Sequence, residues 1–202
     1  MLLIEYQYFP PITVIKTSIA CTHIGISSYE KFRKMSFRNR CIIPAANGPT
    51  SLSVPLLGGR DNALPMKDVR IDNSVNWQQR HWRTISSAYG RSPWFEHYAG
   101  GLEKYYLKKF DFLADWDLEL LQWVFTCLGS QVKIEILEKE PENGNMESLI
   151  DYRNKILPKN FHEEKGIPDY VQVFQEKIGF QPNMSIIDLI FCEGKNARRY
   201  LR

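Results

Sequence analysis

The sequence predicts an α/β fold, with a short mixed sheet early in the chain and mostly helical structure after it. Three observations predict this class: a strand–helix–strand pattern at the start, an Asn-Gly pair between two β-prone runs, and apolar residues at helical spacing in the second half. A chain of 202 residues is long enough for one well-packed core. We therefore expect a single compact domain over residues 1–202, sheet-rich over 1–72 and mostly helical over 73–202.

The opening unit comprises residues 2–26. Residues 2–8 are mostly apolar or aromatic, as in a strand, and Pro10-Pro11 ends that strand and opens a helix that runs to residue 20. Residues 22–26 form a second short apolar run. Ligands of α/β sheets gather outside the carboxyl ends of the strands. Tyr8 and Phe9 are therefore candidates to stack on a ligand, with membership of the core as the alternative.

A β-hairpin follows the opening unit. Residues 41–45 and 50–55 flank Asn47-Gly48, and an Asn-Gly pair between β-prone runs is the strongest short-range hairpin signal. Residues 69–71 then indicate a short strand. The rest of the chain alternates helices with a few other segments: helices over 77–89, 93–106, 111–128, 169–179 and 185–194, a strand over 132–137, and loops over 138–145 and 158–168.

Composition bounds the class of protein. The chain is 44% hydrophobic and 24% charged, which is the balance of a folded globule. Lys and Arg exceed Asp and Glu by only three, so nucleic acid is not favoured as a partner. No apolar run is long enough to span a bilayer and no signal peptide is evident, so we expect a cytoplasmic protein. The cysteines are scattered, which predicts free thiols and no zinc site: Cys21, Cys41, Cys127 and Cys192.

His81 is the first candidate for catalysis, because histidine exchanges protons near neutral pH. Asp68 and Asp72 lie just upstream, where a carboxylate could orient the imidazole ring or simply occupy a turn. On a helix, however, His81 shares one stripe with Trp77 and Ile85. The alternative is therefore a histidine that packs against the core and performs no chemistry.

A basic segment over residues 31–40 is the best indication of a ligand. Arg38 and Arg40 would lie on one face of a strand, where they could bind phosphate bidentately with help from Lys67. The alternative is a solvated edge strand whose charges prevent edge pairing. The chain has no glycine-rich phosphate loop, since Gly58-Gly59 is followed by no Lys-Ser/Thr pair.

Several motifs occur in one order along nearly the whole chain: Tyr8-Phe9-Pro10-Pro11, Phe37-Arg38-Asn39-Arg40-Cys41, Asn47-Gly48-Pro49, Lys67-Asp68-Val69-Arg70-Ile71, Asn76-Trp77, His81-Trp82, Ala88-Tyr89, Phe95-Glu96-His97-Tyr98 and Pro182-Asn183-Met184-Ser185-Ile186-Ile187-Asp188. In these motifs the chain resembles the WbqC-like family. Asn39 and Tyr89 lie within them, and we add both to the ligand-binding candidates.

The resemblance implies a link to bacterial surface polysaccharides such as O-antigen, because the family takes its name from a member encoded among such genes. It suggests a transferase that moves an acyl or aminoacyl group to an activated amino sugar. The partner would be a sugar nucleotide or another phosphorylated small molecule, held by Arg38, Arg40 and Lys67, with His81 as general base. No cofactor is implied, and the oligomeric state, including a homo-oligomer, stays open.

Two other functions are compatible with the sequence. One is a non-catalytic module that binds a glycan precursor or a partner enzyme, and the other is a nucleotidyl transferase. The catalytic hypothesis requires His81, a carboxylate and the Arg38/Arg40 face to meet in one cleft. A nucleotidyl transferase would instead need a phosphate-binding helix N-terminus near Pro10-Pro11.

Overall fold

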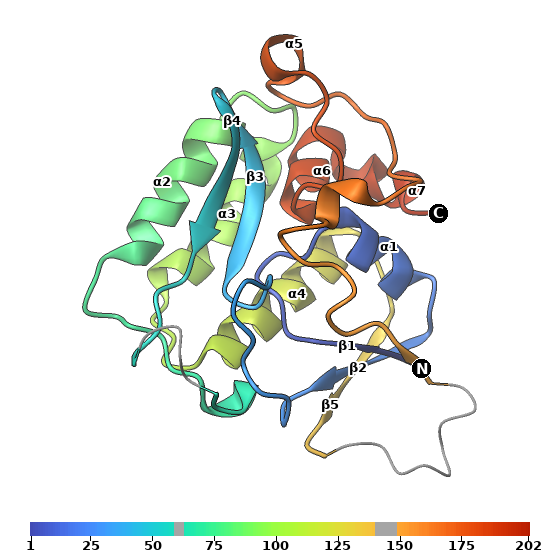
Figure 1. Ribbon diagram of the computed structural model, residues 1–202. Coiled ribbons are helices and arrows are strands. Elements are labelled where there is room, and N and C mark those ends of the chain that lie inside the picture. The colour runs from blue at the N-terminus through green and yellow to red at the C-terminus, as the bar shows by residue number, and fades with distance from the viewer. Residues whose placement is uncertain (59–62, 140–148) are drawn as a thin grey trace.

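A four-stranded parallel sheet forms the lower part of the molecule in the computed structural model, which describes residues 1–58, 63–139 and 149–202 (Figure 1). The strand order is β5-β2-β1-β6. The strands are β1 (Leu2–Ile4), β2 (His23–Ser27), β5 (Lys133–Leu137) and β6 (Ile150–Asp151). Helix α1 (Ile12–Ile19) connects β1 to β2, so the predicted strand–helix–strand opening is confirmed. Because β5 and β6 come from the second half of the chain, both halves build this sheet.

The predicted hairpin is also confirmed. β3 (Arg40–Ala45) pairs antiparallel with β4 (Gly48–Ser53), and Ala45 lies opposite Gly48 next to the turn. Gly48 has a φ of 113°, which only glycine adopts without strain. The hairpin forms a separate two-stranded sheet between α2 and α6 (Figure 1), so the mixed α/β class combines a parallel sheet with an antiparallel ribbon.

The predicted helices of the middle of the chain are present. They are α2 (Trp77–Tyr89), α3 (Phe95–Leu107) and α4 (Leu113–Cys127). Near the C-terminus, α6 (Ile186–Glu193) is the most deeply placed helix, with residues 186–192 all buried, and the short α7 (Ala197–Tyr200) follows it. Helix α6 therefore lies inside the molecule, where it contacts α1, α3, α4 and β3.

Two predicted elements are wrong. Residues 69–71 form isolated bridges, Leu56 with Ile71 and Arg70 with Phe112, instead of a strand. The helix expected over 169–179 is reduced to α5 (Gln175–Ile178). In the extended segment before α5, Tyr170 and Gln172 both donate hydrogen bonds to Asp188 on α6. Helical geometry would point these two side chains in different directions, so the contacts with Asp188 favour extended backbone.

Segment boundaries differ from expectation at two further places. The first strand ends at Ile4 instead of residue 8, and β3 begins at Arg40, so Arg38 precedes the strand. The loop expected over 138–145 lies outside the described residues from position 140 onward. Residues 158–168 carry no helix or strand except the 3₁₀ turn Phe161–Glu163, as predicted.

An aromatic cluster forms the centre of the core. The ring of Trp116 on α4 lies 5.0 Å from that of Trp77 and 5.2 Å from those of Tyr106 and Phe110, centroid to centroid. Such edge-to-face pairs stabilise a core beyond the area that they bury. Across the described ranges, no helix has the length and apolar character that crossing a bilayer requires.

Candidate functional site

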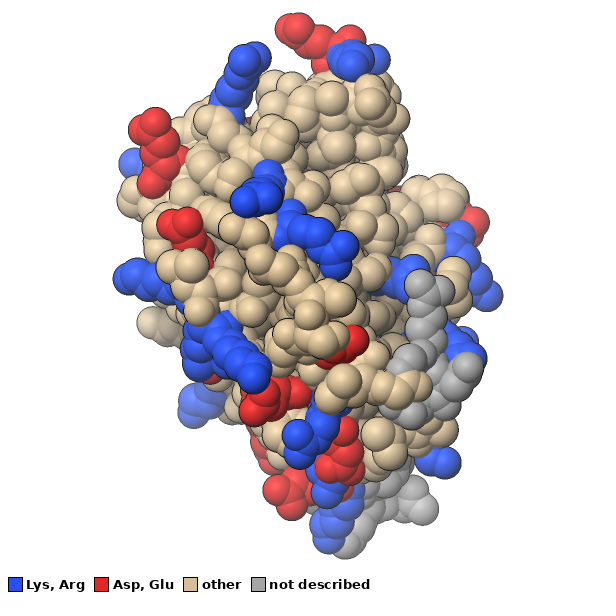
Figure 2. Space-filling model, turned by 90° about the vertical axis from the view of Figure 1, so that its left-hand side faces the viewer, with Lys and Arg blue, Asp and Glu red and all other residues tan. Residues whose placement is uncertain are grey.

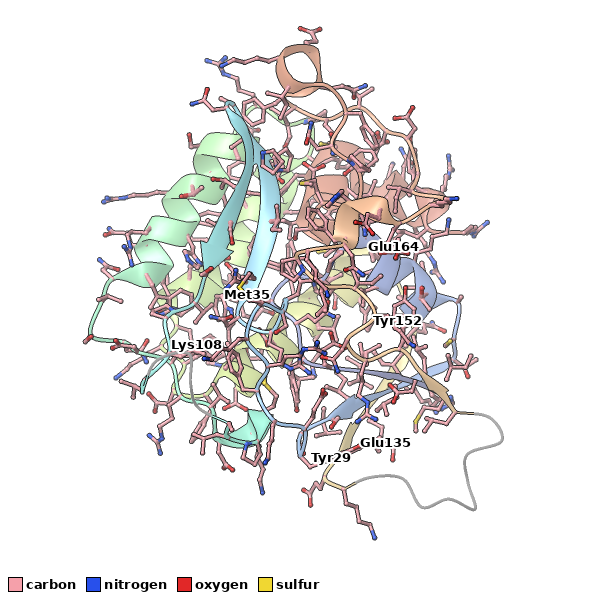
Figure 3. The ribbon with its side chains drawn as sticks, in the orientation of Figure 1. Tyr29, Met35, Lys108, Glu135, Tyr152 and Glu164 are labelled. Atoms are coloured by element: carbon pink, nitrogen blue, oxygen red, sulfur yellow. The ribbon has the colours of Figure 1, made fainter. Side chains whose placement is uncertain are left out.

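Three of the four parallel strands deliver polar side chains to one place, the carboxyl edge of the sheet. Glu5 follows β1, Glu30 follows β2 and Asn154 follows β6. Arg38 joins them: its Nη2 lies 2.5 Å from Glu30 Oε1, and its Nη1 donates to Asn154 Oδ1 at 3.0 Å. We call Glu5, Gln7, Glu30, Arg38 and Asn154 the edge cluster. Figure 3 labels Tyr29, the neighbour of Glu30, where β2 ends.

Internal hydrogen bonds fix the edge cluster. Glu5 accepts from the backbone N–H of Asn154 at 3.0 Å and from Gln7 Nε2 at 2.8 Å, and Asn154 Nδ2 donates to Glu30 Oε1 at 2.9 Å. Arg38 is fully buried, whereas the Glu30 side chain is 18% exposed. Burial raises the pKa of Glu5, and the nearby Arg38 charge opposes that shift. The cluster is thus rigid inside and reaches solvent at Glu30.

Asp117 lies behind the edge cluster on α4. It falls on the apolar stripe of that helix, with Leu113, Leu120 and Leu121 as buried neighbours, and is 1% exposed. Neither of its carboxylate oxygens has a hydrogen-bond partner among the described residues. Burial raises the pKa of Asp117 well above its usual range, and Arg38 partly offsets the shift. A buried carboxylate of this kind is expensive for the fold and is typical of functional sites.

A separate set of hydrogen bonds joins Tyr8 to His81 and Tyr106. Tyr8 follows β1, and its hydroxyl lies 3.1 Å from His81 Nδ1 and 2.7 Å from the Tyr106 hydroxyl. The Tyr8 and His81 rings are stacked with centroids 5.7 Å apart. Burial lowers the pKa of His81 to about 4, although a hydrogen bond with the backbone of Ser53 raises it in part. His81 is therefore neutral at physiological pH and is a weak base.

We expect His81 to make the protein sensitive to acid. The unfolded ring binds a proton near pH 6.5 and the folded ring only near pH 4, so the unfolded state gains protons first as pH falls. Between these values the free energy of unfolding should fall by about 3 kcal/mol, at about 1.4 kcal/mol per unit. Urea unfolding at pH 7 and pH 4.5 should show this loss in the wild type and a smaller one in His81→Gln. His97→Gln, at an exposed histidine, is the control and should lose as much stability as the wild type. An equal loss in His81→Gln and the wild type would show that His81 does not cause the acid sensitivity.

The loop after β1 is fixed by the segment before α6. Phe9 has a φ of 44°, a strained conformation for a bulky residue. Ser185 Oγ donates to the Phe9 carbonyl at 3.1 Å, and Asn183 Oδ1 accepts from the backbone N–H of Thr13 at 2.9 Å. The backbone N–H of Ile12 donates to Met184 O at 3.1 Å. The first backbone N–H groups of α1 therefore already donate hydrogen bonds to Met184 and Asn183.

Comparison of the chain with known proteins identifies its family. The model of the WbqC-like protein family matches residues 7–163 and 150–200. The chain belongs to the WbqC-like family. The uncharacterized protein Rv1507c of Mycobacterium tuberculosis is 25% identical over 199 residues, which cover 85% of this chain and 84% of that protein. No solved structure matches the chain.

The candidate residues predicted from the sequence occupy different places in this WbqC-like protein. Tyr8, Phe9 and His81 meet in the core beside Asp117, and Arg38 belongs to the edge cluster. Whether any of them binds ligand stays a prediction. The backbone N–H of Lys67 donates to Ser28 O, which places exposed Lys67 next to the end of β2.

Other candidates lie away from His81. Asp68 is exposed in a 3₁₀ turn, and Asp72 accepts from the backbone and hydroxyl of Ser74, which lowers the pKa of that carboxyl. Asn39 Nδ2 donates to Val54 O and ties the two hairpin strands together next to Arg40. Tyr89 is buried against Phe191 of α6, with ring centroids 4.9 Å apart. The structure thus brings together His81 and Tyr8, but among the described residues no hydrogen bond or ion pair joins His81 to Asp68 or Asp72.

The sequence of this chain carries signals for some of the residues that sequence reasoning missed. Glu5 and Gln7 are polar residues inside an otherwise apolar and aromatic run, so burial of both could have been expected. Asp117 occupies an apolar position of a helical stripe, which is a signal of the same kind. The partnership of Glu30 with Asn154, 124 positions away, has no local signal.

Proposed function

We propose that this WbqC-like protein is an enzyme that transfers an acyl or aminoacyl group to the amino group of an activated sugar, with its active site at the edge cluster. The location supports a ligand site, because ligands of parallel sheets bind outside the carboxyl ends of the strands. The surface-polysaccharide context rests on the family and supplies the class of sugar.

One observation carries the proposal. In the edge cluster and Asp117, five buried side-chain atoms have no hydrogen-bond partner in the described part of the chain. Four of them are oxygens, Gln7 Oε1, Glu30 Oε2 and the two carboxyl oxygens of Asp117, and at least three of these accept even when Asp117 carries a proton; the fifth is the donor Arg38 Nε. Unpaired buried acceptors are complemented by a ligand rich in N–H and O–H groups. An amino sugar, with its amine and hydroxyls, has this character.

Glu30 is the residue that we assign to the proton transfer. Its Oε1 is fixed by Arg38 and Asn154, while its Oε2 is unpaired, and the side chain is partly exposed. His81 suits this role less well, because it is only 7% exposed and its Nδ1 lies 3.1 Å from the Tyr8 hydroxyl. We therefore assign Glu30 as the general base. His81 and Tyr8 are positioning residues that hold the segment after β1.

The reaction balances with an ester or thioester donor. Glu30 takes a proton from the sugar ammonium group, and the free amine attacks the acyl carbon and forms the C–N bond. The bond from that carbon to the oxygen or sulfur of the donor breaks. The attacking nitrogen loses a second proton as the bond to the donor breaks, and this proton passes to the departing oxygen or sulfur. Glu30 releases the first proton to water, so the products are an amide, an alcohol or thiol, and one proton.

Incubation of the protein with a nucleotide-linked amino sugar and an acyl thioester or aminoacyl ester should give the amide, detected by mass spectrometry. Glu30→Gln should reduce kcat by about 100-fold or more, the range of general-base catalysis. Glu135→Gln is the matched control, because Glu135 is exposed on β5 (Figure 3) and outside the edge cluster. Melting temperatures of both variants separate loss of activity from loss of fold.

The second candidate is a binding module without catalysis. One observation favours it: His81 and Arg38 are both buried, so neither lies open in a cleft. Binding of the amino sugar without turnover by any acyl donor, and with unchanged affinity in Glu30→Gln, would support the module and reject the enzyme. We do not propose nucleotidyl transfer, because Asn183 and Met184 occupy the N-terminus of α1 that would hold phosphate.

A further inference from the structure

A groove beside α1 is separate from the edge cluster, and the proposed reaction does not use it. Its volume is about 590 Å³, and it is lined by residues of α1, by Tyr152, by residues 164–166, and by Arg198, Leu201 and Arg202. Figure 3 shows Tyr152 and Glu164, two residues of its wall, near α1. Cavities of a few hundred cubic ångströms are typical of sites for small molecules.

Basic side chains converge on this groove from three segments that lie far apart in the sequence. Its wall includes four basic residues and one acidic residue, a formal charge of 4 − 1 = +3: Lys16, Lys165, Arg198 and Arg202 against Glu164. The whole chain also carries a formal charge of +3. The groove alone therefore carries as large a formal positive charge as the whole chain. On the face in Figure 2, by contrast, basic and acidic side chains are interspersed.

Two of the four cations are available to a ligand. Lys16 Nζ donates to Gly166 O at 3.1 Å, and Arg198 Nη1 donates to Gly129 O at 2.6 Å, so these two fix the shape of the groove. Lys165 and Arg202 are exposed and have no hydrogen bond or ion pair within the described ranges. Arginine and lysine side chains in this state are suited to phosphate oxygens.

The rest of the wall is suited to a ring. Tyr152 is partly buried, and its phenol, which is protonated at neutral pH, can donate a hydrogen bond. Ile19 and Leu201 add apolar surface. We propose that the groove binds a small phosphate-bearing molecule, with its phosphates on Lys165 and Arg202 and its ring against Tyr152 and Leu201. A concave wall of this size favours a small molecule over a membrane surface.

Calorimetric titration with uridine diphosphate tests the proposal without reference to the proposed reaction. The wild type should bind uridine diphosphate, with affinity that falls as salt rises, and should bind uridine at least tenfold more weakly. Lys165→Ala/Arg202→Ala should weaken binding of the diphosphate at least tenfold. Lys195→Ala/Arg199→Ala is the matched control, because it removes the same charge from exposed C-terminal residues that do not line the groove.

The outcomes distinguish this groove from the edge cluster. Binding that is unchanged in Glu30→Gln and lost in Lys165→Ala/Arg202→Ala supports the groove, whatever the fate of the proposed reaction. Loss of binding in Glu30→Gln alone would place the diphosphate at the edge cluster and overturn the inference. Equal loss in both double variants, no binding at millimolar diphosphate, or binding only to anionic phosphatidylglycerol vesicles would also overturn it.

Discussion

Arg38→Ala should lower the free energy of unfolding by about 3–5 kcal/mol, the cost of breaking a buried ion pair by removing one partner. Arg38 is fully buried, pairs with Glu30 and donates to Asn154. Its loss leaves Glu30 with a single donor, the Asn154 amide, and removes the nearby positive charge that opposes protonation of Glu5 and Asp117. In a chain of this size the melting temperature should fall by about 10 °C, at about 2–4 °C per kcal/mol.

Arg33→Ala is the control for this prediction, since Arg33 lies in the same basic segment but is exposed. Its melting temperature should stay within about 1–2 °C of the wild type, as for most surface substitutions. Arg38→Lys should fall between the two, because lysine keeps the charge but cannot bond Glu30 and Asn154 together from one planar group. Similar melting temperatures for Arg33→Ala and Arg38→Ala would show that the edge cluster does not stabilise the fold.

The parts of the fold that the sequence predicted depend on neighbouring residues. The hairpin required Asn47-Gly48 between two β-prone runs, and Ala45 and Gly48 are indeed opposite each other. The stripe of Trp77, His81 and Ile85 predicted which face of α2 is buried, and all three are buried. Local turn chemistry and helical period suffice for such elements.

The candidate site was harder to predict because distant residues assemble it. The backbone of Asn154 bonds Glu5 across 149 positions, and Arg38 bonds Asn154 across 116. A sequence shows which residue is charged, but tertiary packing decides whether it faces phosphate or a carboxylate of the same chain. The basic segment therefore suggested a phosphate site, whereas Arg38 turns inward to Glu30. Contacts with Asp188 overrode the helical pattern of residues 169–179 in the same way.

Asn183→Ala should be the other strongly destabilising substitution, at about 3–5 kcal/mol for buried hydrogen-bonding groups left unpaired and a lost helix cap. Asn183 is fully buried, and its Oδ1 accepts from the backbone N–H and the hydroxyl of Thr13 at 2.9 and 3.0 Å. Its Nδ2 donates to Phe161 O at 2.7 Å. The side chain thus joins α1, the segment before α6 and the turn at Phe161. Denaturant unfolding of Asn183→Ala should show the lower free energy of unfolding.

The backbone of Asn183 adds a smaller, separable contribution. Its φ is 53°, a conformation that asparagine and glycine adopt more readily than alanine. Asn183→Gly should therefore be about 1 kcal/mol more stable than Asn183→Ala while losing the same hydrogen bonds. Asn183→Asp keeps the acceptor for Thr13 but buries a carboxylate whose second oxygen faces the Phe161 carbonyl, so at neutral pH it should be no more stable than Asn183→Gly. If Asn183→Gly unfolds at the same denaturant concentration as the wild type, the cap does not stabilise α1, and another contact must hold the strained turn at Phe9 in place.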